Sequence, residues 1–529
     1  MREITKYHDT SKTVKERAKN KLFGAVYSHT AIILLLILLQ IGIMVLTFTY
    51  LGNYSTYMNG VISLLSFITA IYIFNEKGNP AFKMTWILFV FLVPVVGVGF
   101  YLFTKAGIGT KYLGARLEKL RVETEPYMQQ NEYVVHAMKG GRVANANLSH
   151  FLYNQVGFPT YGNSQAQYFP LGDDKFPVLI EELNKAEKFI FMEYFIIGEG
   201  YVWDTVLEVL RKKVKEGVEV RLMYDGTCSI SLLPYEYPKQ LREYGIQCKE
   251  FGPIVPILST SQNNRDHRKI FVVDGKVGFT GGINLADEYI NVASRFGYWK
   301  DTGIRLAGEA VWSMTVMFLE MWNYINHSSE DYKQFMPQVY QKEPFEGDGF
   351  VQPYGDTPLD HETVGENIYL NIINHAERYV YIFTPYLIID NEMLVSLCNA
   401  AKRGVDVRIV TPGIPDKKMI FLLTQSHYEP LLKCGVKIYQ YTPGFIHAKS
   451  FLCDDKIGTV GSINLDYRSL FLHFECGVFM YKTKALMQLK EDCMDTFAAS
   501  EEMTLEFCRG QNVFIRIFQG MMRLFAPLL

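Results

Sequence analysis

Hydrophobic residues gather near the start of the chain in three long stretches that contain no charged side chain. They cover Thr30–Leu51, Tyr57–Phe74 and Met84–Phe103, which are 22, 18 and 20 residues long. A helix of about 20 residues crosses a hydrocarbon layer of about 30 Å. The pattern therefore predicts a multi-pass anchor in the cell membrane, with two or three transmembrane helices over residues 30–104, after a basic tail at 1–29. The alternative for each stretch is a helix buried in a soluble core, and it is weakest for the first.

Basic residues flank this predicted anchor on both sides. Seven Lys or Arg side chains lie in residues 1–29, and five more follow the third stretch, at Lys105, Lys111, Arg116, Lys119 and Arg121. Basic flanks favour the cytoplasmic side of a membrane, but three spans would place these two flanks on opposite sides. Two arrangements stay open. Either one stretch is re-entrant, for which Pro94, Gly97 and Gly99 favour the third, or the body lies on the outer face.

The body that follows the anchor contains an internal repeat. Residues 186–195 (AEKFIFMEYF) match residues 376–385 (AERYVYIFTP), and residues 217–226 (GVEVRLMYDG) match residues 404–413 (GVDVRIVTPG). Amphipathic runs with helical spacing lie between these apolar segments, so each copy has the pattern of alternating strands and helices. A repeat of this length indicates a duplicated domain rather than a solenoid.

The predicted fold class is therefore α/β, with two tandem domains of mostly parallel sheet related by a pseudo-two-fold axis. The first domain is expected at residues 166–340 and the second at 341–500. Residues 105–165 form a juxtamembrane segment between anchor and body, and residues 501–529 form a C-terminal amphipathic helix.

Composition and charge narrow the class of protein. Of the 529 residues, 49% are hydrophobic and 20% charged, which excludes a disordered chain or a coiled coil. Residues 1–121 carry 14 basic and 5 acidic side chains, whereas the remaining 408 residues carry 39 and 50. A basic front and a mildly acidic body fit a membrane-attached protein and give no sign of a nucleic-acid partner. The eight cysteines form no CxxC pair, which slightly favours a reducing compartment.

The same constellation of polar residues occurs once in each copy, with the spacing H-x-K-x4-D-x6-G-[GS]-x-N. The first copy has His267, Lys269, Asp274 and Asn284, and the second has His447, Lys449, Asp454 and Asn464. Two occurrences in register with a domain repeat exclude chance as their origin. Because residues two apart on a strand share a face, each His is expected to project together with its Lys.

This array suits chemistry at a phosphodiester. One imidazole attacks phosphorus, and the other donates a proton to the leaving alkoxide and later accepts one from the acceptor. Lys269, Lys449, Asn284 and Asn464 would neutralise and orient the non-bridging oxygens. Asp274 and Asp454, counted with the catalytic residues of the motif, are expected to hold the junction between strand and turn. The chain has no cluster of ligands at known metal spacing, so neither a metal nor another cofactor is expected.

These residues resemble the HKD motifs of the phospholipase D superfamily, and the flanking segments resemble bacterial cardiolipin synthases. Those segments are residues 263–290, 299–308 and 443–475, the apolar run before the body, and the terminal LFAPLL. The resemblance covers about residues 57–529, so Thr30–Leu51 is extra relative to members with two helices. His473 stands where members of the family usually carry Asn, and a structural role is expected for it.

The resemblance implies a ping-pong transfer through a phosphohistidine, with His267 as the nucleophile and His447 as the general acid and base. From the residues alone the two could not be ranked. It also implies that a downstream carboxylate orients each His. Asp301, 34 residues after His267, and Glu475, 28 residues after His447, match those positions. Such a partner fixes the tautomer of an imidazole and raises its basicity.

Three functions stay in view. The first is a cardiolipin synthase, which moves a phosphatidyl group from one phosphatidylglycerol to another and releases glycerol. The second keeps the chemistry but uses water, another alcohol or phosphatidylethanolamine as the acceptor. The third is a lipid-binding scaffold without activity, for which degenerate motifs would be expected. The expected partners are the membrane and its anionic phospholipids, phosphatidylglycerol and cardiolipin, which a stripe of Arg509, Arg516 and Arg523 would face. The oligomeric state stays open.

Overall fold

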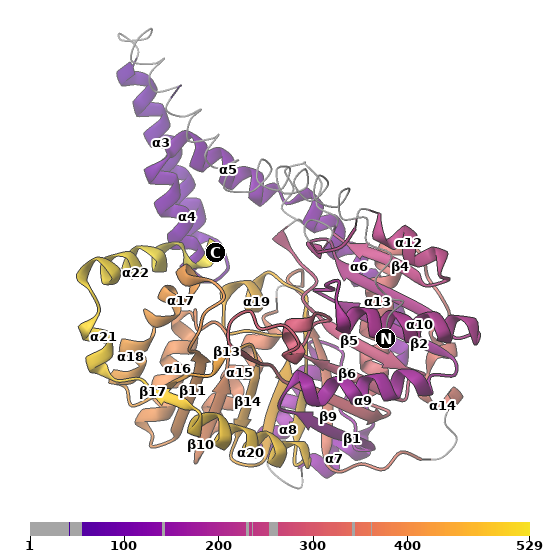
Figure 1. Cartoon of the computed structure of the whole chain (residues 1–529). Helices are drawn as coiled ribbons and strands as arrows, with labels where there is room; N and C mark the ends of the chain where they lie inside the picture. The colour runs from indigo at the N-terminus through magenta and orange to yellow at the C-terminus, as the bar shows by residue number, and fades with distance from the viewer. Residues whose placement is uncertain are drawn as a thin grey trace.

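The computed structural model describes residue 42 and residues 55–139, 143–228, 232–234, 236–252, 263–340, 344–360 and 362–528. The basic tail at 1–29 and the first apolar stretch, Thr30–Leu51, lie outside the described residues apart from residue 42. The body contains two large mixed β-sheets side by side, each flanked by helices (Figure 1).

The two sheets repeat one strand order. The first sheet has the order β1-β8-β6-β5-β2-β3-β4, and the second has β9-β16-β15-β14-β10-β11-β12, with β17 added at its edge. The strands of the first sheet are β1 (Ser164–Phe169), β2 (Phe189–Tyr194), β3 (Glu219–Asp225), β4 (Gln247–Phe251), β5 (Lys269–Val273), β6 (Val277–Gly281) and β8 (Gly303–Gly308). Those of the second are β9 (Phe350–Asp356), β10 (Tyr379–Phe383), β11 (Asp406–Pro412), β12 (Lys437–Tyr441), β14 (Ser450–Cys453), β15 (Ile457–Gly461), β16 (Glu475–Tyr481) and β17 (Ser500–Glu502). This equivalence confirms the duplication inferred from the sequence.

The prediction of mostly parallel sheets was wrong. Within these two sheets, as far as the structure describes them, only β2-β3-β4 and β10-β11-β12 pair in parallel, while the strands that carry and follow the motifs pair antiparallel. The physical reason is the short turn after each motif strand. Residues 274–276 join β5 to β6, and a connection this short can only return the chain as an antiparallel hairpin.

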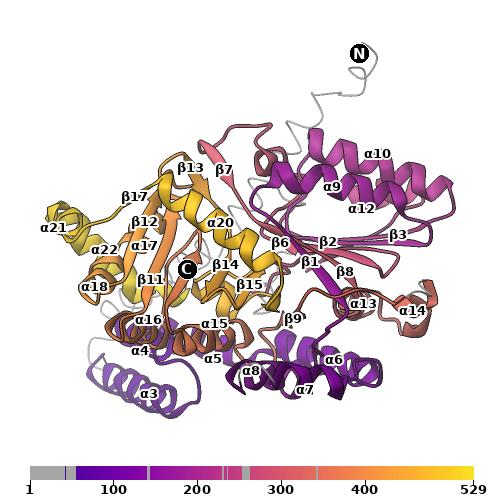
Figure 2. The same cartoon turned by 90° about the horizontal axis from the view of Figure 1, so that it is seen from below.

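Helices cover both faces of each sheet (Figure 2). In the first copy α9 (Gly172–Lys185), α10 (Tyr201–Lys215) and α12 (Tyr237–Glu243) lie on one face and α13 (Val311–Asn326) on the other. In the second copy α15 (Val364–His375) and α16 (Asn391–Lys402) lie opposite α20 (Ala485–Ala498). These helices have an apolar stripe because an amphipathic helix must bury one face against the sheet.

The two copies share one hydrophobic core and are not independent structural units. The largest buried cluster contains Phe191 and Ile270 from the first sheet together with Ile382 and Val478 from the second. A small parallel pair also joins the copies, between β7 (Tyr298–Lys300) and β13 (Gly444–Ile446). The packed interface between the two copies is therefore rigid enough to hold side chains from both copies in position.

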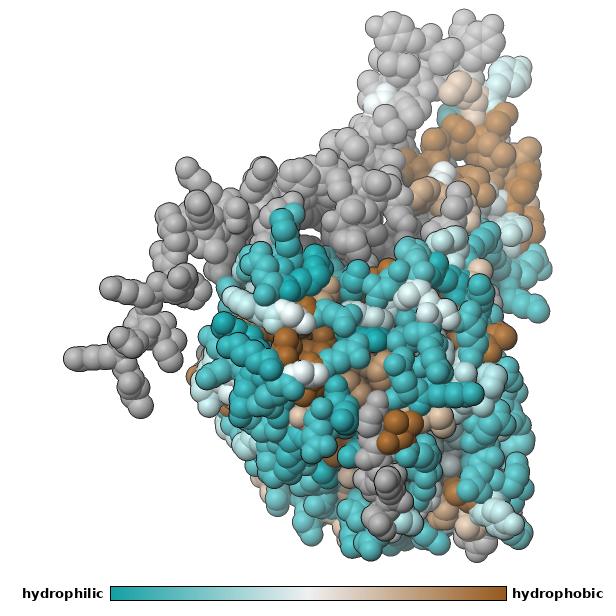
Figure 3. Space-filling view, turned by 90° about the vertical axis from the view of Figure 1, so that its right-hand side faces the viewer, coloured by the Kyte–Doolittle hydropathy of each residue, from teal (hydrophilic) through white to brown (hydrophobic). Residues whose placement is uncertain are grey.

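The N-terminal helices project from one side of this body (Figure 1). They are α3 (Ser55–Asn75), α4 (Pro80–Leu92) and α5 (Pro94–Ala106), which continue into α6 (Ile108–Thr124), α7 (Glu132–Lys139) and α8 (Val143–Asn154). Figure 3 shows apolar side chains gathered on the projecting helices, above a surface of the body that is mainly hydrophilic. On α3 the exposed apolar residues include Leu64, Phe67, Ile68 and Phe74.

The predicted third span, Met84–Phe103, is not one helix. It breaks at Val93, and Pro94 begins a second helix that folds back on the first. The two helices meet closely at Gly97, where a Cβ would lie 2.8 Å from the carbonyl oxygen of Phe89. Each has 13 residues, and about 20 Å of helix is too short to cross a bilayer. Among the described residues only Tyr57–Asn75 has the length and hydropathy of a span, so the structure does not support the multi-pass expectation.

The C-terminal segment forms α21 (Leu505–Gly510) and α22 (Val513–Phe525). The chain end returns to the foot of the projecting helices, where Thr85 of α4 donates a hydrogen bond of 2.8 Å to the carbonyl of Leu524. Helix α22 presents exposed apolar side chains, with Phe514 76% and Ile517 56% exposed. It therefore does not dock on the core with its apolar face.

Candidate active site

The motif histidines lie at the start of two equivalent strands, where the two sheets face each other. His267 lies two residues before β5, and His447 lies between β13 and β14. Each His–Lys pair projects to one side, as the spacing predicted: the Lys269 ammonium donates to the carbonyl of His267 at 2.5 Å, and Lys449 donates to the carbonyl of His447. Arg268, between the pair, points elsewhere and lies 2.6 Å from the carboxylate of Glu193.

The carboxylates orient the histidines across the copies. His267 Nδ1 lies 2.8 and 2.9 Å from the two oxygens of Glu475, and His447 Nδ1 lies 2.6 Å from Asp301 Oδ2. The sequence placed each carboxylate downstream of the His in its own copy. The structure gives each carboxylate to the His of the other copy, so the site exists only at the junction of the two.

Backbone hydrogen bonds repeat this exchange. The amide of His267 donates to the carbonyl of Phe474 at 2.9 Å, and the amide of His447 donates to that of Lys300 at 2.6 Å. Both acceptors immediately precede the orienting carboxylates. This reciprocity is what a pseudo-two-fold relation between the copies predicts.

The second glycine position of the motif serves the orienting carboxylates. A Cβ at Gly282 would lie 2.1 Å from Asp301 Oδ1, so only glycine leaves room for that carboxylate. Ser462 occupies the equivalent position in the second copy and donates to Glu475 at 2.5 Å. The sequence indicated the need for close approach here, but it did not indicate which groups approach.

Asp274 and Asp454 do not join the histidines. The carboxylate of Asp274 accepts three backbone N–H groups, from Glu187, Lys188 and Phe189, at 2.8–2.9 Å. Asp454 does the same for residues 377–379 at 2.8–3.0 Å. Seven residues of extended chain place each Asp roughly 20 Å beyond its His. Their place among the catalytic residues is corrected: they hold the junction between strand and turn.

Replacing Asp274 by Ala is expected to lower stability by about 3 kcal/mol and to leave the turnover of the folded enzyme nearly unchanged. The change removes the acceptor of three backbone N–H groups, one buried and two partly buried, and puts an alanine at a φ of 50°. Thermal unfolding followed by near-ultraviolet circular dichroism measures the loss. Asp274→Asn keeps one acceptor oxygen and tolerates this φ, so its stability should lie between that of the wild type and that of Asp274→Ala. A loss of turnover in a variant that unfolds like the wild type would contradict the structural role.

The two motif asparagines hold protein groups in this structure. The side-chain oxygen of Asn284 accepts the amide of Ile196 at 2.9 Å, and its nitrogen donates to the hydroxyl of Tyr289 at 2.8 Å. Asn464 is buried and makes a hydrogen bond that lowers the pKa of Asp466 against the effect of burial. Asn284 thus fixes the loop after β2 and the ring of Tyr289, which in turn contacts His447.

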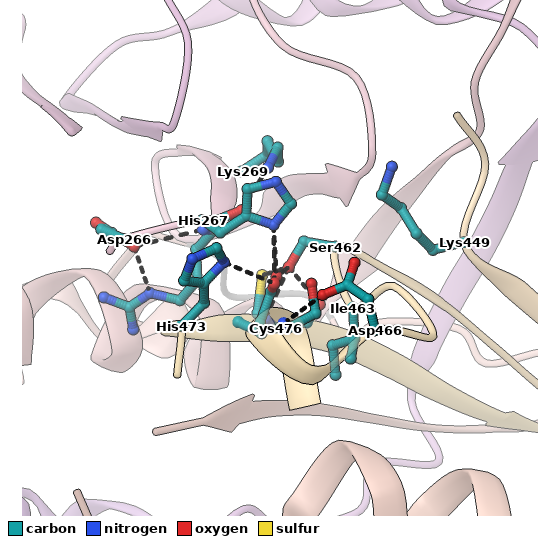
Figure 4. A network of polar contacts seen from close by, with 12 residues as sticks. Asp266, His267, Lys269, Lys449, Ser462, Ile463, Asp466, His473 and Cys476 are labelled. Carbon is teal, nitrogen blue, oxygen red and sulfur yellow. Dashed lines mark hydrogen bonds and ion pairs between the residues drawn. The ribbon is translucent and has the colours of Figure 1, made fainter. Parts of the chain in front are cut away.

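The two imidazoles have different surroundings. The ring of His447 lies 5.5–5.8 Å from the rings of Tyr289, Trp299 and Phe445, an apolar wall. His267 has the ring of His473 at 5.6 Å. Figure 4 shows His473 beside His267 and Lys449 approaching from the opposite side. The sequence analysis expected a structural role for His473 and did not include the aromatic wall.

Burial and the lysines keep the imidazoles neutral. Burial lowers the pKa of His267 well below its usual range, and the charge of Lys269 adds to this effect. Burial and then Lys449 lower the pKa of His447 to about 4, although Asp301 opposes them. Burial also lowers the pKa of Lys269 to about 8 and that of Lys449 to about 7. A bound phosphate would reverse this balance, since its negative charge favours both ammonium groups and an imidazolium.

A third buried lysine lies near the site and carries no sequence signal. Lys175 of α9 is outside both motifs, and burial lowers its pKa to about 8 while the charge of Asp301 raises it. It has no counterpart in the second copy, where the aligned position is Gly365. Only the packing of α9 on the sheet brings it here.

Three side chains of metal-ligand type come together, although the sequence showed no such spacing. Ligand atoms of His267, His473 and Glu475 lie within 4.8 Å of one another. The charges of Lys269 and Lys449 act on the same imidazole. Two ammonium groups whose charges act on this imidazole oppose a cation and favour an anion, so the residues do not fit a metal site.

Comparison with known proteins agrees with this geometry. The family model described as "Cardiolipin synthase, PLD-like domain" matches residues 179–294 and 369–495, one segment in each copy. A "Phospholipase_D-nuclease N-terminal" model matches residues 64–105. A cardiolipin synthase of Alkalihalophilus pseudofirmus is 32% identical over 495 residues, which cover 90% of this chain and 96% of the relative. This chain belongs to the cardiolipin synthase family.

Other relatives extend the comparison. An uncharacterised protein of Streptococcus mutans is 47% identical over 462 residues, 87% of this chain and 99% of its own. The crystal structure of a phosphatidylserine synthase from Haemophilus influenzae superposes with a TM-score of 0.54 at 14% identity, covering 73% of this chain and 98% of that one. This structural likeness shows that the two proteins share a fold.

Proposed function

We propose that this member of the family is a cardiolipin synthase that uses phosphatidylglycerol as both donor and acceptor. The observation that carries the proposal is the pair of crossed His–carboxylate contacts, with one lysine beside each His, in a chain that matches cardiolipin synthases over most of its length. Two oriented imidazoles and two ammonium groups are what a two-step phosphodiester exchange needs.

In the first step His267 Nε2 attacks the phosphorus of the donor lipid. Its Nδ1–H donates to Glu475, which holds the tautomer with the lone pair on Nε2. The bond from phosphorus to the glycerol head group breaks, and a protonated His447 gives its proton to that oxygen as glycerol leaves. Lys269 and Lys449 stabilise the negative charge on the non-bridging oxygens.

In the second step a hydroxyl of the acceptor phosphatidylglycerol takes the place of glycerol. Neutral His447 Nε2 removes its proton, the new oxygen–phosphorus bond forms, and the bond to His267 breaks. Cardiolipin leaves, and His447 holds the proton needed for the next turnover. The aromatic wall around His447 excludes water from this exchange, which favours transfer over hydrolysis.

The unequal surroundings support His267 as the nucleophile. Burial, Lys269 and the neighbouring His473 all favour its neutral form. Burial and Lys449 lower the pKa of His447 to about 4, and there the charge of Asp301 opposes them. The group that must carry a proton in the first step is therefore the one whose surroundings oppose protonation less.

The rate is expected to fall as the pH rises through about 7 to 8, beyond the fall that loss of the His447 proton causes near its pKa of about 4. The lysine pKa values lie at about 7 for Lys449 and about 8 for Lys269, so both groups are charged below this window and lose their charge above it. The quantity to measure is kcat/KM for cardiolipin formation, because it reports the free enzyme. Lys449→Arg should move the alkaline limb to higher pH, since a guanidinium stays charged. If the alkaline limb does not shift, a group other than Lys449 causes the fall in rate.

The function is tested with purified protein and phosphatidylglycerol vesicles. Cardiolipin and glycerol in equal amounts are the expected products. Phosphatidic acid as the only product would identify a hydrolase instead, and labelled phosphatidylethanolamine added to the vesicles tests the other acceptor.

We further propose that the N-terminal helices and α22 attach the enzyme to a membrane. Helix α3 has the length and hydropathy of a span, and α4–α5 form a short re-entrant hairpin. If the third apolar stretch does not cross the membrane, the two basic flanks no longer have to lie on opposite sides of it. The apolar face of α22 lies at the foot of α4, at the depth of an interface. In this proposal the body that the helices attach consists of the two domains at residues 166–340 and 341–500.

A fluorophore sensitive to polarity tests the place of α22. Phe514→Cys labelled with such a dye is expected to brighten and shift to the blue when phosphatidylglycerol vesicles are added, because its side chain enters the interface. The control is Met494→Cys, which is 47% exposed, on helix α20, and this helix lies at the opposite end of the body from α22 (Figure 1). Equal responses at both positions would show that α22 does not contact the lipid.

A further inference from the structure

The short strand that ends beside His447 belongs to neither large sheet. Among the described strands β7 pairs with β13 alone. The carbonyl of its last residue, Lys300, accepts the amide of His447 at 2.6 Å. The carboxylate of the next residue, Asp301, lies 2.6 Å from His447 Nδ1. The end of β7 therefore holds both the backbone and the ring of this histidine.

The side chain of Lys300 joins this strand end to the other copy. Its ammonium lies 2.5 Å from Asp492 Oδ1 of α20 and donates to the carbonyl of Pro170 at 3.3 Å. The second carboxylate oxygen of Asp492 accepts the hydroxyl of Tyr168 at 2.6 Å. Lys300 is 4% exposed and Asp492 8%. A buried ion pair in which both carboxylate oxygens have partners is held in one geometry.

The acid of this pair is itself fixed relative to His447. Helix α20 packs against β14, the strand that follows His447, and against β1 of the first sheet (Figure 2). One turn before Asp492, the side chain of Gln488 accepts the amide of Tyr168 at 3.0 Å. The contacts thus form a closed ring from His447 through Lys300, Asp492 and α20 back to the strand after His447. A shift of β7 away from His447 would break the ion pair.

Apolar rings take the place of this pair beside the other histidine. Phe474 is the equivalent of Lys300, because each immediately precedes an orienting carboxylate, and its ring lies 5.5 Å from that of Phe251. Counted along the chain from the orienting carboxylates, the buried Phe318 is the equivalent of Asp492. The ion pair is therefore not a consequence of the duplication and belongs to the side of His447.

Stability alone does not explain a buried ion pair at this place. Apolar residues of similar volume often replace such a pair without loss of stability. What the pair adds is direction, because its hydrogen bonds fix the distance between β7 and α20. In the proposed reaction His447 gives a proton to one oxygen and takes a proton from another, and each transfer needs hydrogen-bond distance. A displaced His447 would slow both transfers, whereas attack by His267 would proceed.

We propose that Lys300 and Asp492 form a positioning pair for His447. The pair holds β7 so that Asp301 and the Lys300 carbonyl keep the imidazole in reach of the leaving and the attacking oxygens. This inference rests on the proposed function and assigns two further residues to its proton-transfer steps. Both residues act through the contacts of β7 with His447 rather than on the lipid.

The test compares two rates in each variant. A phosphatidyl donor with a p-nitrophenol head group releases that group without a proton, so formation of the labelled enzyme reports attack by His267. Lys300→Met and Asp492→Asn are each expected to lower cardiolipin formation from phosphatidylglycerol about tenfold and to change the labelling rate by less than about twofold. Loss of folded protein would lower both rates together, so the ratio of the two rates separates positioning from stability.

Two further variants control for the loss of an ion pair. Lys490→Met is the matched control on the same helix, because Lys490 lies 2.6 Å from Asp455 and should keep the wild-type ratio when changed. The double variant Lys300→Met with Asp492→Asn leaves no member of the pair charged, and its amide oxygen still accepts the hydroxyl of Tyr168. Its folding does not depend on an unpaired buried charge, and its ratio should match that of the single variants.

A wild-type ratio in the double variant would overturn the positioning pair. So would equal losses of the two rates in a double variant that unfolds like the wild type. Added to Asp301→Asn, Lys300→Met should lower cardiolipin formation little further, because both changes act on His447, and a further tenfold loss would contradict the inference. Wild-type protein that makes phosphatidic acid but no cardiolipin would instead overturn the proposed function, so the two failures are distinguishable.

Discussion

Replacement of His267 by Asn is expected to lower cardiolipin formation by about 10⁴-fold or more. The variant cannot form the bond to phosphorus, and the remaining charges only position the lipid. Initial rates in phosphatidylglycerol vesicles measure the loss. His375→Asn, an exposed histidine at the end of α15, is the matched control and should keep full activity.

A donor with a p-nitrophenol head group separates the roles of the two histidines. This group leaves without a proton, so His447→Asn should still form the phosphatidyl–enzyme and accumulate it, because no base activates the acceptor. His267→Asn should form none. The label on the protein should be acid-labile, as expected for a phosphohistidine. Labelling of His267→Asn but not of His447→Asn would reverse the assignment.

Glu475→Gln is expected to lower cardiolipin formation by about 10²-fold, through His267 rather than through His447. The amide cannot accept the Nδ1–H of His267 as a carboxylate does, so the reactive tautomer is lost. Formation of the labelled enzyme from the p-nitrophenol donor should slow by the same factor.

Asp301→Asn gives the contrasting result, because its partner is His447. Cardiolipin formation from phosphatidylglycerol should fall by a similar factor. The labelling step with the p-nitrophenol donor should slow much less, because that donor needs no general acid. Glu501→Gln, an exposed glutamate, controls for the substitution itself. If Asp301→Asn slowed the labelling step and Glu475→Gln did not, each carboxylate would act within its own copy.

The motif was sufficient to propose the chemistry because the His and Lys of each copy lie close together along the chain and the motif occurs twice. His267 and Lys269, and likewise His447 and Lys449, are two residues apart on a strand, and alternation alone puts each pair on one side. The spacing also predicts that the motif aspartates hold a junction, and each accepts three backbone N–H groups there. Their place among the catalytic residues was wrong.

Strand direction and helix length, unlike the motif, cannot be read from the spacing of residues within one short segment. An apolar strand has the same pattern in a parallel and in an antiparallel pair, and only the short turn after Val273 decides between them. Hydropathy averages over a window, so the uncharged stretch Met84–Phe103 resembles a span even though Pro94 divides it.

The sequence by itself determined the duplicated α/β architecture, the two motifs proposed to do the chemistry and the family, because each follows from patterns within one segment or from its repetition. The tertiary structure decided which carboxylate contacts which histidine and the unequal walls around the two imidazoles. Those depend on how two copies face each other across a shared core. Contacts between residues that are more than a hundred positions apart leave no trace in local spacing.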